Sequence, residues 1–303
     1  MPSHHPLRAY QPPATVYELP HYLIDRAASL FAGAWFDEAQ IHSVFEGKQA
    51  GRVFVDDPDT PTAALLCRTY GYYLADSTTT TTLRAFLRDE PAEVGIFHAL
   101  YGYMVDGAWR DALLAEQPHR WRIIDRKAFI LPPGTPAPRV VPPTGTEIRR
   151  LDRVLAERAD GELHAGIGMF WGSYERFIAG GFGFCSMVHG AMASVAYAIS
   201  VSSHSANIAV NTSPSHRRRG FSTLTSSAYI DHCLAHGIRP TWDTDRENEP
   251  SIRTALRLGL VEDRPFYQLS PKDKPKNALS HGRWRQGNPH PTAPPGLIPW
   301  RKV

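Results

Sequence analysis

Residues 207–223 read Asn207-Ile208-Ala209-Val210-Asn211-Thr212, then Ser213-Pro214-Ser215-His216, then Arg217-Arg218-Arg219-Gly220-Phe221-Ser222-Thr223. The first six residues predict a short strand, and Pro214 predicts a turn after it. The residues from Phe221 onward predict an amphipathic helix. A turn that opens a helix presents several backbone N–H groups at the positive end of that helix. The stretch therefore predicts a binding site for an anion.

The composition of this turn indicates a phosphate ligand. Gly220 allows a ligand to approach the backbone closely, and the hydroxyl groups of Ser222 and Thr223 can donate hydrogen bonds. Three consecutive arginines, Arg217 to Arg219, supply positive charge. A basic run can also indicate nucleic-acid binding, but its position between a strand and a helix favours the phosphates of a small cofactor. We predict a ligand that carries a pyrophosphate.

The same turn resembles the signature of the GCN5-related N-acetyltransferases (GNAT superfamily), which reads Arg or Gln, two residues, Gly, one residue, then Gly or Ala. Residues 217–222 follow this pattern, with Ser222 in the place of Gly or Ala. The resemblance is closest to the two-lobed bacterial branch that includes antibiotic self-resistance acetyltransferases. It covers residues 150–269 and, more faintly, residues 20–130. An ordered series of matches carries it: Trp171, Phe177, residues 180–185, Thr212, Gly220, residues 240–243, Asn248, Ser251 and Gly259.

The resemblance implies a fold and a reaction. The fold is α/β (α+β): a mixed, partly antiparallel sheet flanked by helices, with a degenerate GNAT-like N-terminal lobe that forms one wall of an acceptor cleft. The reaction is direct transfer of an acetyl group from acetyl-CoA to an amine. A small metabolite or antibiotic is the first choice of acceptor, and a protein lysine or N-terminus is the second. The alternative from another class is a non-catalytic module that binds CoA or a partner.

The resemblance also implies which residues contact the co-substrate. The backbone at the end of the strand pairs with the pantetheine arm, the turn surrounds the pyrophosphate, and two residues of the next helix lie beside the arm. Asn248 is also an ordinary candidate for a helix N-cap, and Ser251 has the same double interpretation. The implied contacts are Val210, Asn211, Thr212, Arg217, Arg218, Arg219, Gly220, Phe221, Ser222, Thr223, Asn248 and Ser251.

The sequence offers several candidates for the group that removes the proton from the amine. In many relatives a glutamate ten residues before the turn acts as general base, and Asn207 stands there in this chain. An asparagine has no titratable base, so three possibilities stay open: another residue acts, an ordered water suffices, or the site is catalytically weak. His204 and Asp243 are candidates for the base, with Asp245 a further one. Each also has an ordinary surface or structural interpretation.

Tyr267 is the candidate for the acid that protonates the leaving thiolate. Relatives often place a tyrosine near the last strand for this role, and Tyr267 lies in a predicted strand that follows Gly259 and Leu260. In an alternative register of this strand, its neighbour Phe266 occupies that position instead. A tyrosine on a half-buried strand also often packs in the core.

Composition places the chain among globular proteins: its 303 residues are 42% hydrophobic and 21% charged, with a net charge of +3. No apolar run approaches the roughly 18 residues that span a bilayer, and the first residues lack the order of a signal peptide, so we expect a cytoplasmic protein. The three cysteines, at positions 67, 185 and 233, are far apart and predict reduced core residues. The fourteen histidines are scattered along the chain, and we expect no metal site.

Proline clusters divide the chain into two lobes. The C-terminal tail has seven lysines and arginines against one acid, which suggests either a solvated tail or contact with an acidic partner. We expect no membrane or nucleic-acid partner, and the oligomeric state stays open. The predicted boundaries are a flexible N-terminus (1–16), an N-terminal GNAT-like lobe (17–131), a proline-rich linker (132–145), a catalytic GNAT domain (146–270) and a basic tail (271–303).

Periodicity and turn residues predict the elements of both lobes. In the first lobe we expect a helix from Tyr17, a hairpin over 52–67, helices at 83–88 and 108–116, and strands at 93–97 and 122–130. In the second lobe we expect helices at 148–159, 171–177, 221–236 and 250–258, and strands at 182–188, 191–202, 207–212, 239–244 and 261–269.

Overall fold

A computed structural model describes residues 16–33, 38–68, 71–76, 103–105, 107–136 and 138–272. The predicted helix at 83–88, the predicted strand at 93–97 and nearly all of the basic tail lie outside these residues. Within the described residues, no helix is long and apolar enough to cross a membrane.

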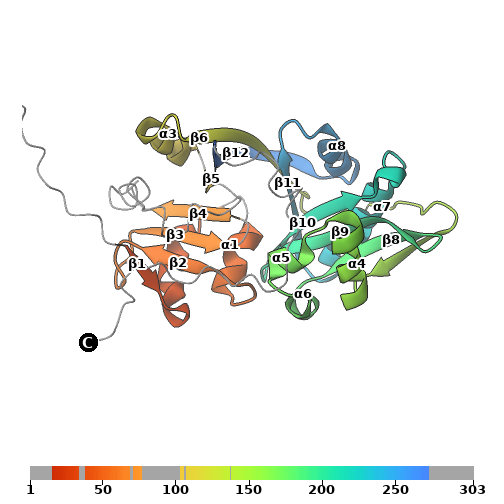
Figure 1. Cartoon of the computed structure of the whole chain (residues 1–303), viewed down its shortest axis with the longest axis horizontal. Helices are drawn as coiled ribbons and strands as arrows, with labels where there is room; N and C mark the ends of the chain where they lie inside the picture. Colours follow the sequence, from red (N-terminus) through yellow and green to blue (C-terminus); the bar gives the residue numbers. More distant parts are fainter. Residues whose placement is uncertain are drawn as a thin grey trace, which may run out of the picture.

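The first half of the chain builds a small lobe of short strands with helices packed on it (Figure 1). The hairpin predicted over 52–67 and the helix predicted at 108–116 are confirmed. The elements of this N-terminal lobe are β1 (Tyr17–Leu19), the 3-10 helix η1 (His21–Phe31), α1 (Glu38–Phe45), β2 (Arg52–Val55), β3 (Ala63–Arg68), β4 (Gly71–Asp76), β5 (Tyr103–Val105), α3 (Gly107–Glu116) and β6 (Trp121–Ile130).

The second half builds a larger lobe that contains the phosphate-type turn. Its elements are β7 (Thr146–Arg150), α4 (Arg153–Leu163), α5 (Ile167–Trp171), α6 (Tyr174–Gly180), β8 (Gly183–Val188), β9 (Ala191–Val201), β10 (Ser205–Thr212), the 3-10 helix η4 (Pro214–His216), α7 (Phe221–Ala235), β11 (Arg239–Asp245), α8 (Glu249–Arg257) and β12 (Val261–Pro271).

The prediction over 148–159 was wrong in its first residues. Residues 146–150 form β7 and pair with β8, and the helix begins only after Asp152. Asp152 caps α4 by accepting a hydrogen bond from the Leu155 N–H at 2.8 Å. The predicted helix at 171–177 is also two helices, because Gly172 adopts a φ of 76° and Ser173 caps α6.

The helix predicted from Tyr17 begins later and has a different form. Tyr17–Leu19 pairs with β2 as strand β1, and η1 starts at His21 after Pro20. Pro20 has no N–H to donate and favours the extended backbone seen there. The buried face of η1 is formed by Ile24, Ala27 and Phe31.

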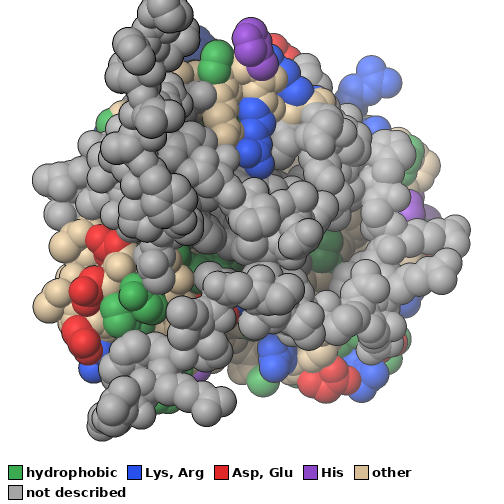
Figure 2. Space-filling model, turned by 60° about the vertical axis from the view of Figure 1, so that its left-hand side comes forward, with side chains coloured by type: hydrophobic (Ala, Val, Ile, Leu, Met, Phe, Trp, Pro, Cys, Tyr) green, Lys and Arg blue, Asp and Glu red, His purple; other side chains and the backbone are tan. Residues whose placement is uncertain are grey.

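One continuous sheet of twelve strands joins the lobes, in the order β1-β2-β3-β4-β5-β12-β6-β11-β10-β9-β8-β7. It is mixed: β10 runs parallel to β11 and β4 parallel to β5, while the other neighbours are antiparallel. A mixed sheet with flanking helices confirms the predicted fold class. On the face drawn in Figure 2, coloured acidic side chains form small separate groups with basic side chains between them.

The two lobes exchange their last strands. Strand β6 ends the N-terminal half, yet it lies between β11 and β12, pairing Ile130 with Thr241 on one side and with Val261 on the other. Strand β12 ends the C-terminal half, yet its other edge pairs with β5 of the N-terminal lobe. Each lobe therefore completes its sheet with a strand of the other (Figure 1).

Side chains on the exchanged strands enter the core of the opposite lobe. Phe266 on β12 is fully buried in the N-terminal core, together with Phe31 and Val53. Phe129 on β6 is buried in the C-terminal core, where Trp171 and Tyr197 also lie. Burial of a phenylalanine side chain contributes about 1.5–3 kcal/mol, so each exchanged strand stabilises the lobe that receives it.

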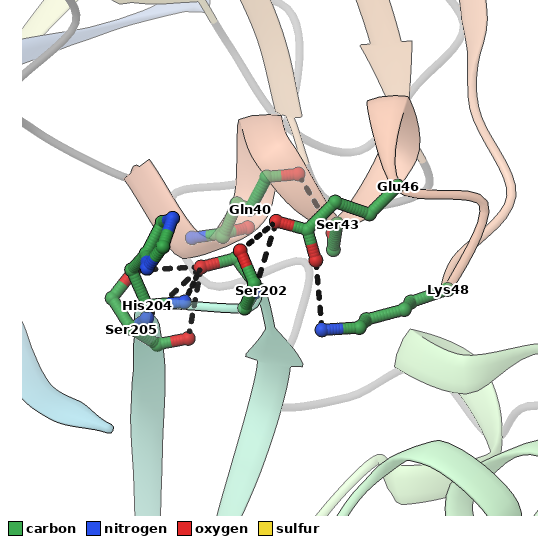
Figure 3. Close-up of polar contacts among 8 residues, drawn as sticks. Gln40, Ser43, Glu46, Lys48, Ser202, His204 and Ser205 are labelled. Atoms are coloured by element: carbon green, nitrogen blue, oxygen red, sulfur yellow. Dashed lines mark hydrogen bonds and ion pairs between the residues drawn. The ribbon is translucent and has the colours of Figure 1, made fainter. Parts of the chain in front are cut away.

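Polar contacts also connect the lobes next to this sheet. The buried Arg68 on β3 donates from Nη1 to Ser200 Oγ on β9 at 2.8 Å and from Nη2 to Gln49 Oε1 at 3.0 Å. Gln49 donates in turn to the Ile199 carbonyl at 2.9 Å. At the end of α1, Glu46 accepts from the N–H and hydroxyl of Ser203 (Figure 3). The N-terminal lobe is thereby fixed against β9 and the β9–β10 turn.

Because each lobe contributes a strand to the sheet of the other, we expect that neither half of the chain folds alone. Residues 138–303 expressed without the first half lack β6, which leaves the edge of β11 unpaired and removes the partner of β12. We expect this fragment to be insoluble or to melt without cooperativity, and to form a soluble complex when it is co-expressed with residues 1–137. Size-exclusion chromatography and thermal melting measure this. A separate fragment that melts cooperatively near the temperature of the full chain contradicts the prediction.

A second stability prediction concerns His232 on α7. Its ring lies 4.4 Å from that of Phe182 and 4.0 Å from that of His236, measured between centroids. Burial, followed by the charges of His236 and Arg150, lowers the pKa of His232 from 6.5 to about 4. Between these two values the unfolded chain binds a proton here and the folded chain does not. The contribution of this group is therefore fully present above pH 6.5 and is lost as the pH falls toward 4.

We expect His232→Gln to weaken the pH dependence of stability. Between pH 7.5 and pH 5 the melting temperature of the variant should fall less than that of the wild type, by about 2–4 °C. His119→Gln is the control, because this histidine lies exposed in the turn before β6. Differential scanning calorimetry at both pH values measures the effect. An equal fall in wild type and His232→Gln shows that His232 does not titrate in this way.

Candidate functional site

The site begins where two parallel strands separate. Strand β10 pairs with β9 from Ala206 to Thr212, but its ladder with β11 covers only Ser205–Asn207 against Arg239–Thr241. Beyond Thr241, β11 continues in a ladder with β6 as far as Asp245. The backbone of residues 208–212 on the side of β11 therefore lies outside the ladder between β10 and β11. This backbone can pair with an extended ligand as it would with a strand.

The turn after β10 leads these residues to a helix N-terminus. Arg218 has a φ of 59° and Gly220 a φ of 84°, and α7 begins at Phe221. The N–H of Leu224 makes the first bond of α7, to the Gly220 carbonyl at 3.0 Å. The N–H groups of residues 221–223 precede that bond, and Gly220 offers no side-chain cap to accept from them. An anion at this position completes their hydrogen bonds.

Space and charge at the turn also suit an anion. A Cβ placed on Gly220 would meet no atom within 4 Å, so the backbone here is open to an approaching group. Arg217, Arg218 and Arg219 are all exposed. Phe221 anchors the turn, because it is buried beside Ala193 and its ring lies 5.4 Å below the Arg219 guanidinium. The predicted order of strand, turn and helix start is therefore confirmed, and phosphate binding stays a prediction.

The predicted residues of β10 face both sides of the sheet. Asn211 donates from Nδ2 to the Leu163 carbonyl at 3.2 Å, which fixes the end of α4. Thr212 Oγ1 lies 2.9 Å from Ser194 Oγ on β9. Val210 packs against the C-terminal core. These side chains are used in packing, so the part of β10 that remains open to a ligand is its backbone.

Asn248 and Ser251 have the structural roles that a helix start gives them. Asn248 caps α8, and its Oδ1 accepts from the Ser251 N–H at 3.3 Å. Ser251 Oγ accepts from Trp242 Nε1 on β11 at 3.0 Å. The start of α7 lies beside the middle of α8, since Ser222 and Thr254 place their hydroxyl oxygens 3.4 Å apart. The N-cap interpretation of Asn248 is confirmed, and contact with a co-substrate stays a prediction.

Asn207 and Asp243 meet at the point where the strands separate. Asn207 Nδ2 donates to Asp243 Oδ2 at 3.1 Å and to Thr241 Oγ1 at 3.3 Å. The other oxygen of Asp243 bonds to Arg126 Nη2, and Asp245 bonds to Arg126 Nη1. A carboxylate from β11 therefore lies beside the position at which the resemblance places a glutamate on β10.

Tyr267 lies on the other face of the sheet. Consecutive residues of a strand point to opposite faces, and its neighbour Phe266 is on the face of Arg126, whose guanidinium lies 5.9 Å from the Phe266 ring. The ring of Tyr267 packs instead under the guanidinium of Arg110 on α3, at 4.3 Å. The structure does not bring Tyr267 together with Asp243.

His204 lies at the opposite end of β10 from the phosphate turn. It belongs to the turn between β9 and β10, beside the Ser202–Ser205 hydrogen bonds (Figure 3). Seven residue steps separate Ser205 from Thr212, which corresponds to about 23 Å of strand. Of the three predicted catalytic residues, only Asp243 lies where β10 and β11 separate.

Sequence reasoning missed Arg126, because it belongs to the first lobe. A signal was present: Asp125, Arg126 and Lys127 interrupt an apolar strand with three consecutive charges. Arg126 is nearly buried, at 10% exposure of its side chain, while Asp125 is exposed. No group of three or more His, Cys, Asp or Glu side chains within the described ranges is placed to hold a metal ion.

Comparison with known proteins identifies the family of this fold. A family model described as GNAT acetyltransferase matches residues 28–269. The uncharacterized N-acetyltransferase YdfB of Bacillus subtilis (strain 168) is 22% identical over 224 residues, which cover 73% of this chain and 85% of the relative.

Solved structures share the two-lobed architecture. A GCN5-related N-acetyltransferase-like protein from Streptococcus suis aligns with a TM-score of 0.61 and 21% identity, over 83% of this chain and 99% of its own. A tandem GNAT protein from the clavulanic acid biosynthesis pathway aligns with a TM-score of 0.58 and 14% identity, over 84% of this chain and 98% of its own. The predicted resemblance and fold are confirmed, and this chain belongs to the GNAT acetyltransferase family.

Proposed function

We propose that this protein transfers an acetyl group from acetyl-CoA directly to the amine of a small molecule. The observation that carries the proposal is the helix N-terminus at Gly220, which follows a strand whose outer edge is open to a ligand. Membership of the family supports acetyltransfer as the reaction class.

The residues of this chain fit acetyl-CoA in two places. The N–H groups at the start of α7 and the exposed Arg217 to Arg219 suit the pyrophosphate. The backbone of residues 208–212 suits the amides of the extended pantetheine arm, because it lies outside the ladder with β11. Asn207 and Thr212 are about 16 Å apart along the strand. An arm that starts at the phosphates thus extends toward Asn207.

When bound, acetyl-CoA supplies an acetyl thioester, and the protein must bring an amine to it and accept a proton. The N-terminal lobe covers the face of the sheet on which Ser200 and its cross-strand partner Asn207 lie, through the contacts of Arg68 and Gln49. The acceptor therefore binds between the lobes, against that face. The tandem GNAT protein of similar fold belongs to a small-molecule pathway, which agrees with a small acceptor.

A non-catalytic CoA-binding protein is the rival function, and the amide of Asn207 at the expected glutamate position favours it. The two functions differ in turnover. The proposed enzyme releases CoA thiol from acetyl-CoA in the presence of a primary amine, whereas the rival binds CoA and releases none. A panel of propylamine, benzylamine, phenethylamine and glucosamine, with thiol release as readout, separates them.

Gly220→Trp is expected to abolish CoA binding and acetyl transfer. The substitution fills the open space at the start of α7 and strains a residue with a φ of 84°. Because the pyrophosphate site is lost, we expect affinity for CoA to fall at least about 100-fold, as when several charged hydrogen bonds are removed together. Isothermal titration calorimetry with CoA and the thiol-release assay measure the two effects.

Gly237→Trp is the matched control. Gly237 follows the other end of the same helix, has a φ of 66° and also has nothing within 4 Å of its Cβ position. It imposes a similar strain on α7 without reaching the phosphate turn, so CoA affinity should stay near that of the wild type. Normal CoA binding by Gly220→Trp, or equal loss in both variants, contradicts the assignment of the site.

A further inference from the structure

Asn207 and Asp243 form a buried link between the two separating strands. Asn207 is the last residue of β10 that pairs with β11, and Asp243 lies two residues beyond its partner Thr241. Residues two apart on a strand share a face, so both side chains point toward the same side of the sheet. Their hydrogen bond, at 3.1 Å, holds the carboxylate of Asp243 at the point where β10 and β11 separate.

Asn207 retains an acceptor that no donor fills. The residue is only 2% exposed, and Oδ1 has no hydrogen-bond partner among the described residues. The orientation of the amide follows from chemistry, because the carboxylate of Asp243 accepts and so the NH₂ group must face it. A ligand that donates an N–H or O–H to this oxygen, directly or through a water, removes the free-energy cost of the unsatisfied acceptor.

The carboxylate of Asp243 is held at both oxygens. Arg126 donates to Oδ1 and Asn207 donates to Oδ2. Arg126 is fixed in turn by Asp245, whose carboxylate accepts from its other amino group. The Asp243 side chain is 12% exposed, against 53% for Asp245. Asp243 is thus oriented rigidly at the edge of the buried region, while Asp245 faces solvent.

We propose that Asp243 accepts the proton that the acceptor amine loses, and that Asn207 and Arg126 position its carboxylate. This inference depends on the proposed acetyl transfer. Asp243 then performs, from β11, the task that the resemblance implies for a glutamate at position 207 on β10. Asp243 is the catalytic residue, and the other two act through it.

The proton balance of the step is simple. The neutral amine nitrogen uses its lone pair to bond to the acyl carbon, and the carbon–sulfur bond breaks with its electron pair on sulfur. The nitrogen becomes positively charged and more acidic as its new bond forms, and its proton passes to the carboxylate of Asp243. Sulfur leaves as a thiol after it takes a proton from solvent. Asp243 returns its proton to solvent, so the products are an amide and a thiol.

Asp243→Asn tests the proposal with the smallest change in shape. We expect kcat for acetylation of the most reactive amine of the panel to fall about 100-fold, within the range of general base catalysis. The Kd for CoA should stay within about 2-fold, as expected for a change outside the phosphate site. Asp125→Asn makes the same change one residue from Arg126 on an exposed position and should leave kcat unchanged.

An exchange of the two side chains distinguishes loss of the general base from a merely structural effect of the substitution. The double variant Asn207→Asp with Asp243→Asn keeps the volumes and returns one carboxylate to the pair. We expect it to recover at least about 10-fold of the lost kcat, because general base catalysis follows the carboxylate.

Two results overturn the proposal. One is an Asp243→Asn variant with normal kcat and normal CoA binding. The other is an exchange variant that binds CoA normally but is no more active than Asp243→Asn. Both leave acetyl transfer by the wild type intact and are therefore distinct from failure of the proposed function, in which the wild type releases no thiol with any amine of the panel.

Discussion

The insertion of β6 between β11 and β12 is the constraint on which the site depends. It gives β11 a partner on the side away from β10, so β11 continues as a strand after its ladder with β10 ends at Thr241. Without that partner, the residues from Trp242 to Asp245 would have no sheet to hold them. The same strand carries Arg126, which holds the carboxylates of Asp243 and Asp245. One strand of the first lobe thus creates the separation and orients the carboxylate beside it.

The exchange of strands also explains why the lobes act as one unit. Phe266 belongs to the last strand of the chain but is buried in the N-terminal core, and Phe129 belongs to the first lobe but is buried in the C-terminal core. Arg68 and Gln49 add polar contacts to Ser200 and Ile199 on β9. Motion of one lobe against the other would break strand ladders and expose apolar side chains. The N-terminal lobe therefore helps to shape the candidate site.

The sequence predicted best the features that local chemistry determines. The strand, turn and helix at residues 207–235 follow from apolar alternation, Pro214 and Gly220, and the hairpin over 52–67 follows from its turn residues. The sequence predicted element boundaries less accurately where a helix cap or a partner strand determines them. Helix α4 starts later than expected, because Thr146–Arg150 pairs with β8 and Asp152 caps the helix. The contacts of Arg126 and the face of Tyr267 were out of reach, since both depend on which strands become neighbours. Asn207 and Asp243 were each noted, but their hydrogen bond depends on the register of β10 and β11.

The central claim is that CoA binds along the open edge of β10 and at the start of α7. Hydrogen–deuterium exchange with and without CoA tests it most directly, because those amides gain a hydrogen-bond partner only when the ligand binds there. We expect slower exchange at residues 208–212 and 220–223 in the presence of CoA, with little change at His204 and along β12. Unchanged exchange in these two segments, under conditions where calorimetry shows that CoA is bound, would contradict it.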